Sequence, residues 1–211
     1  MKKISQNQLE RLPIYLKELK TLKKNGVLIV SSTMLANELE LNEEQVRKDF
    51  QLVSKKAGKP KKGRLVTQLI QDIEDFLGYS NMLEAVLIGV GNLGGALLSY
   101  QGFSNYGLNI IAGFDIDENK IGTTLGGKPI YDIKDLETIL TNLHVKIVIL
   151  ATPSDMTLSI FEKLKTMDIK AIWNFAPIFL RDSNHKIIIE NVDLASSLAK
   201  LSHKLKEKEC Q

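Results

Sequence analysis

Residues 1 to about 78 carry apolar side chains at the spacing of amphipathic helices. One face of the first such stretch is formed by Leu9, Leu12, Leu16, Leu19 and Leu22. Because these leucines recur every three or four residues, they predict a first helix. Gly26 follows the last of them and is placed to end that helix.

Two shorter helices are predicted next. Ser31 and Ser32 are candidate N-caps of the second helix, because serine side chains accept hydrogen bonds from free backbone N–H groups. Asn42 is the candidate N-cap of a third helix over residues 43–53, and Gln45 occupies the position that completes a capping box. Since only a tight turn at residues 41–42 separates them, the two helices predict a helix-turn-helix.

The segment KKAGKPKKGRLV, residues 55–66, interrupts this helical pattern. Gly58, Pro60 and Gly63 disfavour a helix here. The same segment carries a cluster of cations: Lys55, Lys56, Lys59, Lys61, Lys62 and Arg64. We interpret it as a basic loop in the position of a wing.

The pattern changes at Met82, where short apolar runs replace the helical stripes. These runs are AVLIGV (85–90), LNIIAGF (108–114), VKIVILA (145–151) and AIWNF (171–175), with KIIIE (186–190) as a further strand. Such runs are typical of parallel strands buried on both faces, and helical stretches alternate with them. The second part is therefore predicted to be a doubly wound α/β domain of the Rossmann type, in which Thr152 caps a helix that starts at Pro153.

The chain is expected to end in a helix within residues 191–211. Its apolar residues alternate spacings of four and three, as in a coiled-coil seam: Leu194, Leu198, Leu201 and Leu205. We predict that this helix packs on a partner subunit; packing on its own sheet is the alternative. The sequence thus predicts three parts, residues 1–78, 79–190 and 191–211.

The motif from Gly89 to Gly94 fits G-x-G-x-x-G between a predicted strand and a predicted helix, which is the context that gives this pattern weight. Asp115 ends the next strand, where a carboxylate accepts hydrogen bonds from ribose hydroxyls and repels a 2′-phosphate. The residues that predict NAD(H) binding are Gly89, Val90, Gly91, Asn92, Leu93, Gly94 and Asp115. The alternative is a glycine turn used for close packing.

Composition and chain length limit the classes of NAD(H)-binding protein that the sequence is expected to represent. The chain has 211 residues, 44% of them hydrophobic, and no apolar run of the ~18 residues that a membrane span needs, so we expect a cytoplasmic protein. Only a short segment follows Phe175, which leaves no room for a catalytic domain. Three scattered histidines and the single Cys210 offer no catalytic or metal-binding set, so we expect no enzyme and no metal.

Charge and the helix-turn-helix favour DNA as a partner. Residues 1–80 hold 15 Lys and Arg against 10 Asp and Glu, whereas residues 81–211 hold 13 against 15. In a helix-turn-helix the second helix enters the major groove, and a basic wing grips the DNA backbone. The candidate DNA-binding residues are Ser31, Ser32, Gln45, Arg47, Lys48, Lys59, Lys61, Lys62 and Arg64. A merely solvated helix face is the alternative.

Over nearly its full length the chain resembles the Rex redox-sensing transcriptional repressors. The matching stretches are QVRKDF (45–50), IGVGNLGGAL (88–97), FDID with KIG (114–122), AIWNFAP (171–177) and ENVDLASSLAKL (190–201). The resemblance implies a winged-helix DNA-binding domain, a Rossmann domain that senses the NADH/NAD ratio, and a domain-swapped C-terminal helix in a homodimer. It further implies a near-palindromic operator that is released when NADH binds.

The resemblance also implies roles for single residues. Thr152 and Pro153 join the cofactor-binding set, Asn174 and Phe175 would lie near the nicotinamide, and Tyr100 would touch the cofactor as well. The residues that would couple the cofactor pocket to domain orientation are Lys17, Tyr100 and Asp193.

The chain departs from the family at two places. Lys17 stands where many members have an arginine, and a lysine does not reproduce bidentate geometry. The basic loop is one residue longer than usual and lacks the family's aromatic residues, which leaves the operator sequence open. A small NAD-dependent oxidoreductase and a CoA-binding Rossmann module remain as alternative functions.

Overall fold

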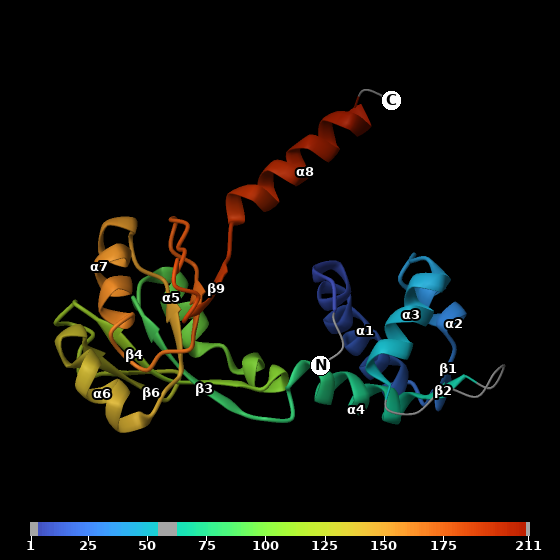
Figure 1. Ribbon diagram of the computed structural model, residues 1–211, viewed down its shortest axis with the longest axis horizontal. Coiled ribbons are helices and arrows are strands. Elements are labelled where there is room, and N and C mark those ends of the chain that lie inside the picture. Colours follow the sequence, from blue (N-terminus) through green and yellow to red (C-terminus); the bar gives the residue numbers. More distant parts are fainter. Residues whose placement is uncertain (1–3, 55–62, 210–211) are drawn as a thin grey trace. The chain divides into compact units, whose positions relative to one another are not determined.

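The computed structural model describes residues 4–54 and 63–209, and it divides the chain into two compact units between Asn81 and Met82 (Figure 1). The first unit is mainly helical, and the second is built on a seven-stranded sheet. The predicted Lys59, Lys61 and Lys62 of the basic loop lie outside the described residues.

The first unit contains α1 (Gln6–Lys24), β1 (Ile29–Val30), α2 (Ser32–Glu38), α3 (Glu43–Val53), β2 (Arg64–Leu65) and α4 (Val66–Leu77). The strands β1 and β2 pair antiparallel, with Ile29 opposite Leu65 and Val30 opposite Arg64. This pairing joins the C-terminal end of the predicted basic loop to the strand that precedes α2, the first helix of the helix-turn-helix formed by α2 and α3. The arrangement is that of a winged helix, as predicted.

The predicted first helix is present, and four of its five leucines are buried, whereas Leu9 is 40% exposed. The buried stripe continues from Leu12 toward the N-terminus through Gln8 and Arg11, whose side chains reach Asp49 of α3. At its N-terminal end, the face of α1 that contacts α3 is therefore polar, because Gln8 and Arg11 there bind the carboxylate of Asp49.

The predicted helix caps are confirmed in part. The Ser31 side chain accepts from Met34 N and caps α2, whereas Ser32 is the first residue of that helix and not its cap. The Asn42 side chain accepts from Gln45 N and caps α3. The described hydrogen bonds give α3 no return bond from Gln45; the complete capping box joins Ser5 and Gln8 at the start of α1.

The sheet of the second unit has the strand order β5-β6-β4-β3-β7-β8-β9. Its strands are β3 (Leu83–Ile88), β4 (Leu108–Asp115), β5 (Thr124–Leu125), β6 (Lys128–Asp132), β7 (Ile147–Leu150), β8 (Ala171–Asn174) and β9 (Ile188–Asn191). All pairs are parallel except β5 with β6. In chain order the six parallel strands run 3-2-1-4-5-6, which is the order of the dinucleotide-binding doubly wound fold.

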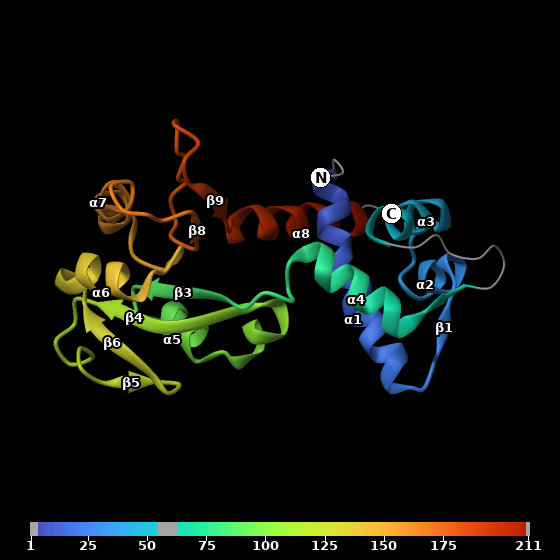
Figure 2. The same ribbon diagram turned by 60° about the horizontal axis from the view of Figure 1, so that its bottom comes forward.

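Helices cover both faces of this sheet (Figure 2). The helical segments are α5 (Asn92–Ser99), η1 (Gln101–Tyr106), η2 (Ile133–Asp135), α6 (Leu136–Leu143), α7 (Ser154–Leu164) and α8 (Leu194–Glu209). Because side chains alternate along β3, Val86 and Ile88 pack with α6 and α7, while Ala85 and Leu87 pack with Leu98 of α5. The predicted α/β fold is confirmed.

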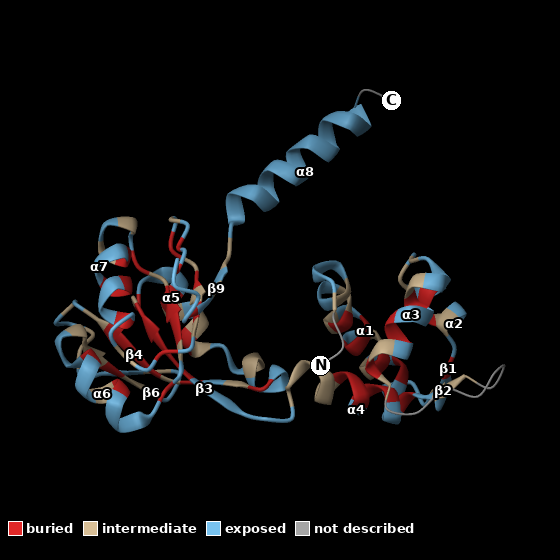
Figure 3. Cartoon of the chain, viewed as in Figure 1, coloured by how far each residue is buried: buried red, intermediate tan, exposed pale blue. Residues whose placement is uncertain are grey.

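The last helix differs from the others in its burial. α8 follows β9 after two residues, and all its residues are exposed (Figure 3). The alternative that α8 packs on its own sheet is therefore wrong for this chain by itself. None of the described helices is long and apolar enough to cross a membrane.

Candidate functional site

Two glycines of the turn between β3 and α5 are required by the fold itself. Gly89 has φ +95°, and a Cβ at this position would lie 2.7 Å from the carbonyl oxygen of Ala151. A Cβ on Gly94 would lie 1.8 Å from the carbonyl oxygen of Gly89. Neither position accepts a side chain, because the loop after β7 and the start of α5 both press against this turn.

Gly91 is a different case. It is the N-cap of α5, has φ −77°, and a Cβ added to it would meet no atom within 4 Å. It also has no side chain that could accept a hydrogen bond from the first-turn N–H groups of α5. The missing side chain thus leaves open space beside a helix N-terminus, which is what the approach of a pyrophosphate requires.

Asp115, at the end of β4, is tied to the turn. Its Oδ2 accepts from Val90 N at 2.8 Å, and its Oδ1 accepts from Ile116 N at 2.8 Å and Asp117 N at 2.9 Å. Lys120 Nζ lies 3.4 Å from Oδ2 and also 3.4 Å from a carboxylate oxygen of Asp117. A carboxylate has about four acceptor positions, which these three backbone donors and Lys120 take up, so Asp115 fixes the glycine turn, and a further donor would take the place of the long Lys120 contact.

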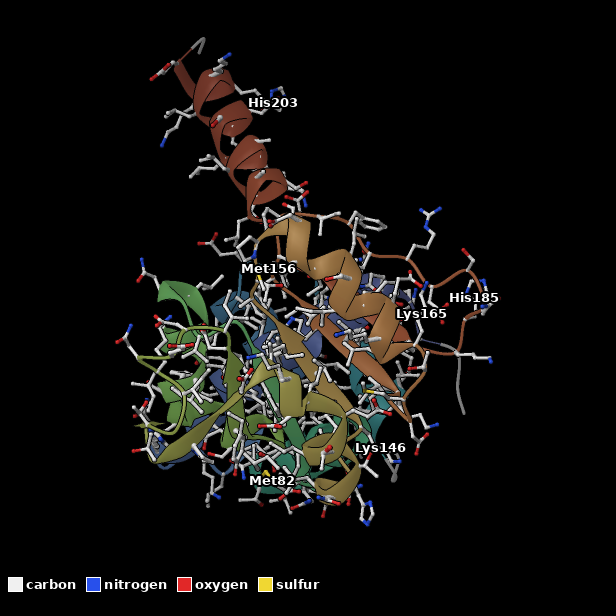
Figure 4. All side chains as sticks on the ribbon, turned by 90° about the vertical axis from the view of Figure 1, so that its left-hand side faces the viewer. Met82, Lys146, Met156, Lys165, His185 and His203 are labelled. Carbon is white, nitrogen blue, oxygen red and sulfur yellow. The ribbon has the colours of Figure 1, made fainter. Side chains whose placement is uncertain are left out.

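A pocket of about 220 Å³ opens between the carboxyl ends of β3, β4 and β7, where the strand order reverses. Its lining includes the turn glycines Gly89 and Gly91, the polar residues Asp115, Lys120 and Thr152, and Pro153. Its apolar wall includes Met156, which points inward from α7 (Figure 4). Doubly wound sheets bind nucleotides at this reversal, and these residues fit an adenosine with its ribose at Asp115.

Thr152 and Pro153 line this pocket, but their predicted capping roles are wrong by one residue. Pro153 is the N-cap of α7, which begins at Ser154. The buried Thr152 side chain instead lies 2.9 Å from the hydroxyl of Thr157. Thr157 lies one turn into α7, and its hydroxyl also donates to the Pro153 carbonyl. Thr152 therefore contacts the side of α7 instead of capping its N-terminus.

Asn174, at the end of β8, is buried and holds the loop that follows it. Its amide nitrogen donates to the carbonyl of Ile178 at 2.7 Å and to Asn191 Oδ1 at 2.8 Å, and its Oδ1 accepts from Ala176 N. Asn191 in turn accepts from Leu180 N and donates to the Leu180 carbonyl. Asn191 was not singled out from the sequence, because a single asparagine after a predicted strand has no distinctive spacing.

Aromatic rings form a continuous row from Tyr100 to Phe175. Ring centroids are 4.9 Å apart for Tyr100 and Phe103, 5.5 Å for Phe103 and Trp173, and 4.8 Å for Trp173 and Phe175. Tyr100 is 54% exposed at one end. The row connects two predicted cofactor residues, Tyr100 and Phe175, through Phe103 and Trp173, which were not singled out from the sequence.

The predicted coupling residues lie on both units. Asp193 precedes α8 and accepts hydrogen bonds from the side chain and the backbone N–H of Ser196, which lower the pKa of its carboxyl. Tyr100 belongs to the same unit, whereas Lys17 is an exposed residue of α1 in the first unit. Their joint role in coupling stays a prediction.

A buried carboxylate anchors α3, the second helix of the helix-turn-helix, to α1. Asp49 is 1% exposed and accepts from Gln8 Nε2, Arg11 Nε and the Tyr15 hydroxyl at 2.8 to 2.9 Å. Burial, with the hydrogen bond to Asp49, raises the pKa of Tyr15 to about 12. This anchor fixes α3 against α1, and the sequence did not reveal it because hydrophobic spacing does not register a buried charge.

The opposite face of α3 presents its cations. Arg47 and Lys48 are exposed, and both pair with Glu44 on the same helix. Gln45 is half-buried. Arg64 on β2 donates to Ser54 Oγ at 2.8 Å and lies 5.9 Å from the ring centre of Phe50, so its guanidinium packs within the first unit.

The histidines do not assemble into a site. His185 lies in the loop before β9 and His203 on α8, well apart from each other (Figure 4), and His144 ends α6; all three are exposed. Within residues 4–54 and 63–209, no group of three His, Cys, Asp or Glu side chains is arranged to hold a metal ion.

Family models match both units. The model described as a putative DNA-binding protein N-terminus matches residues 3–51, and the CoA binding domain model matches residues 80–178.

Curated relatives cover almost the whole chain. A redox-sensing transcriptional repressor Rex from Bacteroides fragilis is 38% identical over 203 residues, covering 96% of this chain and 91% of that protein. The protein of the same name from Treponema denticola is 41% identical over 90% of each chain. That from Bacillus subtilis is 38% identical and covers 97% and 93%.

Solved structures of RSP, a Rex-family repressor, share the fold. The complex with β-NAD⁺ and operator DNA matches with a TM-score of 0.90, covering 100% of this chain and 96% of that one. The complex with β-NADH matches with a TM-score of 0.87, covering 100% and 98%. Both are 31% identical in sequence to this chain.

Proposed function

The chain belongs to the Rex family of redox-sensing transcriptional repressors, and on this premise we propose that it binds operator DNA and releases it when NADH binds. One observation carries this function. The same chain holds a winged helix with exposed cations on α3 and a dinucleotide turn in which Gly91 faces open space. RSP, with the same fold, has been crystallised with NAD⁺ and operator DNA and with NADH.

NAD(H) would be held by the turn between β3 and α5 and by the pocket at the strand reversal. The α5 N-terminus would meet the pyrophosphate, and Asp115 would accept from a ribose hydroxyl while repelling a 2′-phosphate. The loop held by Asn174, together with Phe175 and Tyr100, would border the nicotinamide. The dinucleotide acts here as the signal, so we propose that no catalytic turnover accompanies its binding.

DNA would be read by a homodimer. α8 offers four leucines that are 56% to 65% exposed, which supports a helix exchanged between two subunits. Two copies of α3 would then face two half-sites of a near-palindromic operator, one helical turn or a multiple apart. The relatives come from bacteria such as Bacillus subtilis, and we place this repressor in the cytoplasm with the DNA it binds.

The signal requires a difference in NADH affinity between two dimer arrangements. A ligand that binds both arrangements equally shifts nothing, however tightly it binds. We therefore propose that the arrangement that binds operator has the lower affinity for NADH, and that Lys17, Tyr100 and Asp193 contribute to the difference.

A titration of DNA binding tests the function. A labelled duplex, selected by this chain from a random-sequence pool, is bound in the presence of NADH, NAD⁺ or NADPH and followed by fluorescence anisotropy. We expect NADH to weaken DNA binding by about tenfold or more, and NADPH, as the matched control, to act only at much higher concentration. Tight NADH binding with unchanged DNA affinity would refute the sensor mechanism.

CoA is a second candidate ligand, because the CoA binding domain model matches residues 80–178. Both ligands carry an adenosine and a pyrophosphate, which the same pocket could hold. Thermal melting with CoA and with NADH at equal concentrations separates them. The proposal expects a larger upward shift with NADH, because Asp115 disfavours the phosphate on the CoA ribose.

A further inference from the structure

Glu44 is in contact with both cations of the recognition helix. Arg47 Nη2 lies 2.7 Å from each of its carboxylate oxygens and Arg47 Nε lies 3.1 Å from Oε2. Lys48 Nζ lies 3.6 Å from Oε1. These are i,i+3 and i,i+4 pairs, which face each other on a helix. Glu44 also sits in the first turn of α3, where the helix dipole favours a carboxylate.

The contacts engage one edge of the Arg47 guanidinium. They use Nε and Nη2, and none of the hydrogen bonds of Arg47 within the described residues uses Nη1. A guanidinium reads guanine through two parallel N–H groups directed at O6 and N7. The edge formed by Nη1 and Nη2 can supply both while the Nε side remains on Glu44. The side chain stays half exposed, at 50%, so this outer edge is accessible.

From this geometry we propose that Glu44 is a specificity-determining residue, which orients Arg47 for a guanine base edge and withholds Arg47 and Lys48 from DNA phosphates. This inference rests on the proposed function of α3 as the DNA-reading helix. Any phosphate that approaches these cations must compete with Glu44 and meets its negative charge. A base edge meets neither obstacle, because it takes the outer side of Arg47.

The two kinds of DNA contact should therefore respond differently when Glu44 is removed. Binding to arbitrary sequence depends on neutralised phosphates and weakens as salt rises. Binding to the operator depends additionally on the orientation of Arg47. Glu44 lowers the affinity for arbitrary sequence and supports the affinity for the operator. Its net effect is therefore on the ratio of these two affinities.

The experiment compares E44A and E44Q with the wild type. Each full-length protein is titrated at several salt concentrations against the duplex selected by the wild type and against a scrambled duplex of equal length and composition. We expect E44A to bind the scrambled duplex about fivefold more tightly, with a salt slope steeper by about 0.9 for one additional phosphate contact. Its affinity for the selected duplex should not rise, so the specificity ratio falls.

E43A is the matched control. Glu43 is exposed in the same first turn of α3 and forms no ion pair in the described part of the chain, so its removal changes the net charge equally. We expect E43A to keep the ratio and E44Q, which retains the side-chain length without the charge, to lower it less than E44A does. Melting curves of the variants confirm that these exposed positions leave the fold intact.

The outcomes separate this inference from the proposed function. An unchanged ratio in E44A, or an equal fall in E43A, overturns the role of Glu44. Two other results would refute the proposed DNA reading by α3 itself. One is that the wild type enriches no duplex from the random-sequence pool, and the other is that R47A binds the selected duplex with wild-type affinity. Loss of binding in R47A with an unchanged ratio in E44A refutes only the specificity role.

Discussion

Gly91 and Gly94 differ in what their missing side chains serve. A Cβ on Gly94 would collide with the backbone of Gly89, whereas a Cβ on Gly91 would meet no protein atom. Glycine at position 94 is therefore a requirement of folding, whereas no protein contact requires glycine at position 91, where we propose that the cofactor approaches. The sequence motif predicted both positions and their roles, since its second glycine admits the pyrophosphate and its third allows close packing of the helix on the strand.

Substituting the two glycines should separate stability from cofactor affinity. We expect G91A to change the free energy of unfolding by less than about 0.5 kcal/mol and to weaken NADH binding at least about tenfold, because its methyl group occupies the approach of the pyrophosphate. G94A should lower the melting temperature markedly. Calorimetric NADH titration and thermal melting measure both effects. Wild-type NADH affinity in G91A would contradict the assignment.

Tyr15 should make the first unit sensitive to high pH. Burial and Asp49 raise its pKa to about 12 in the folded chain, against about 10 when unfolded. The folded state thus holds the proton more tightly, so this contribution is complete below pH about 10 and is lost as the pH rises through about 12. We expect at most about 3 kcal/mol from this group, since each pKa unit corresponds to about 1.4 kcal/mol.

Urea unfolding from pH 9 to pH 11.5, for the wild type and Y15F, measures this contribution. Y15F lacks the titrating phenol, so its stability should fall less steeply with pH, although its stability at pH 9 is lower because Asp49 loses one donor. Parallel pH profiles for the two proteins would show that Tyr15 does not titrate as expected.

Elements with strong periodicity were predictable from the sequence, and weakly patterned ones were not. The leucine spacing located α1, and the apolar runs located β3, β4, β7 and β8. β5 and β6 were missed, because the segment KPIYD contains a proline and mixes polar with apolar residues. β6 nevertheless pairs with β4 as an edge of the parallel part of the sheet, where the β5 hairpin covers it.

The candidate site was predictable only where a motif with known geometry was present. The glycine turn and Asp115 follow from spacing, as do the exposed cations of α3. Asp49 and Asn191 could not be predicted, because their hydrogen-bond partners lie 34 to 41 residues away in the first case and 11 to 17 residues away in the second. Such contacts are set by tertiary packing, which local pattern does not encode.

The anchoring of α3 should be separable from its DNA contacts. D49A would leave Arg11, Tyr15 and Gln8 without their common acceptor, and we expect it to destabilise the first unit by about 3 kcal/mol. R47A, on the exposed face of the same helix, should change stability by less than about 0.5 kcal/mol yet impair DNA binding.

Amide hydrogen exchange measures this difference locally. In D49A the peptides from α1 and α3 should lose protection, while those from β3 and β7 keep it, because the second unit has its own core. R47A should match the wild type throughout. Unchanged exchange of α3 in D49A would show that the carboxylate does not hold this helix in place.

At the scale of the whole molecule, α8 is the element whose apolar sequence pattern does not fit its exposed environment in a single chain. It carries Leu194, Leu198, Leu201 and Leu205 at coiled-coil spacing, but each of these side chains is at least 56% exposed. In the homodimer that we propose, a second subunit would remove this disagreement, because it would bury the seam and bring a second α3 to the operator. Dimerisation and DNA affinity should therefore fail together when the seam is disrupted.

The double variant L198D/L201D tests this link. Fully burying a leucine stabilises by about 2 kcal/mol, so replacing two with aspartate should weaken the dimer by about a thousandfold or more. Sedimentation should show a monomer, and DNA affinity should fall because one subunit reaches one half-site. A199D adds a charge to the same helix away from the seam and should stay dimeric. A double variant that remained a dimer would place the interface elsewhere, and a monomer with wild-type operator affinity would show that two half-sites are not read together.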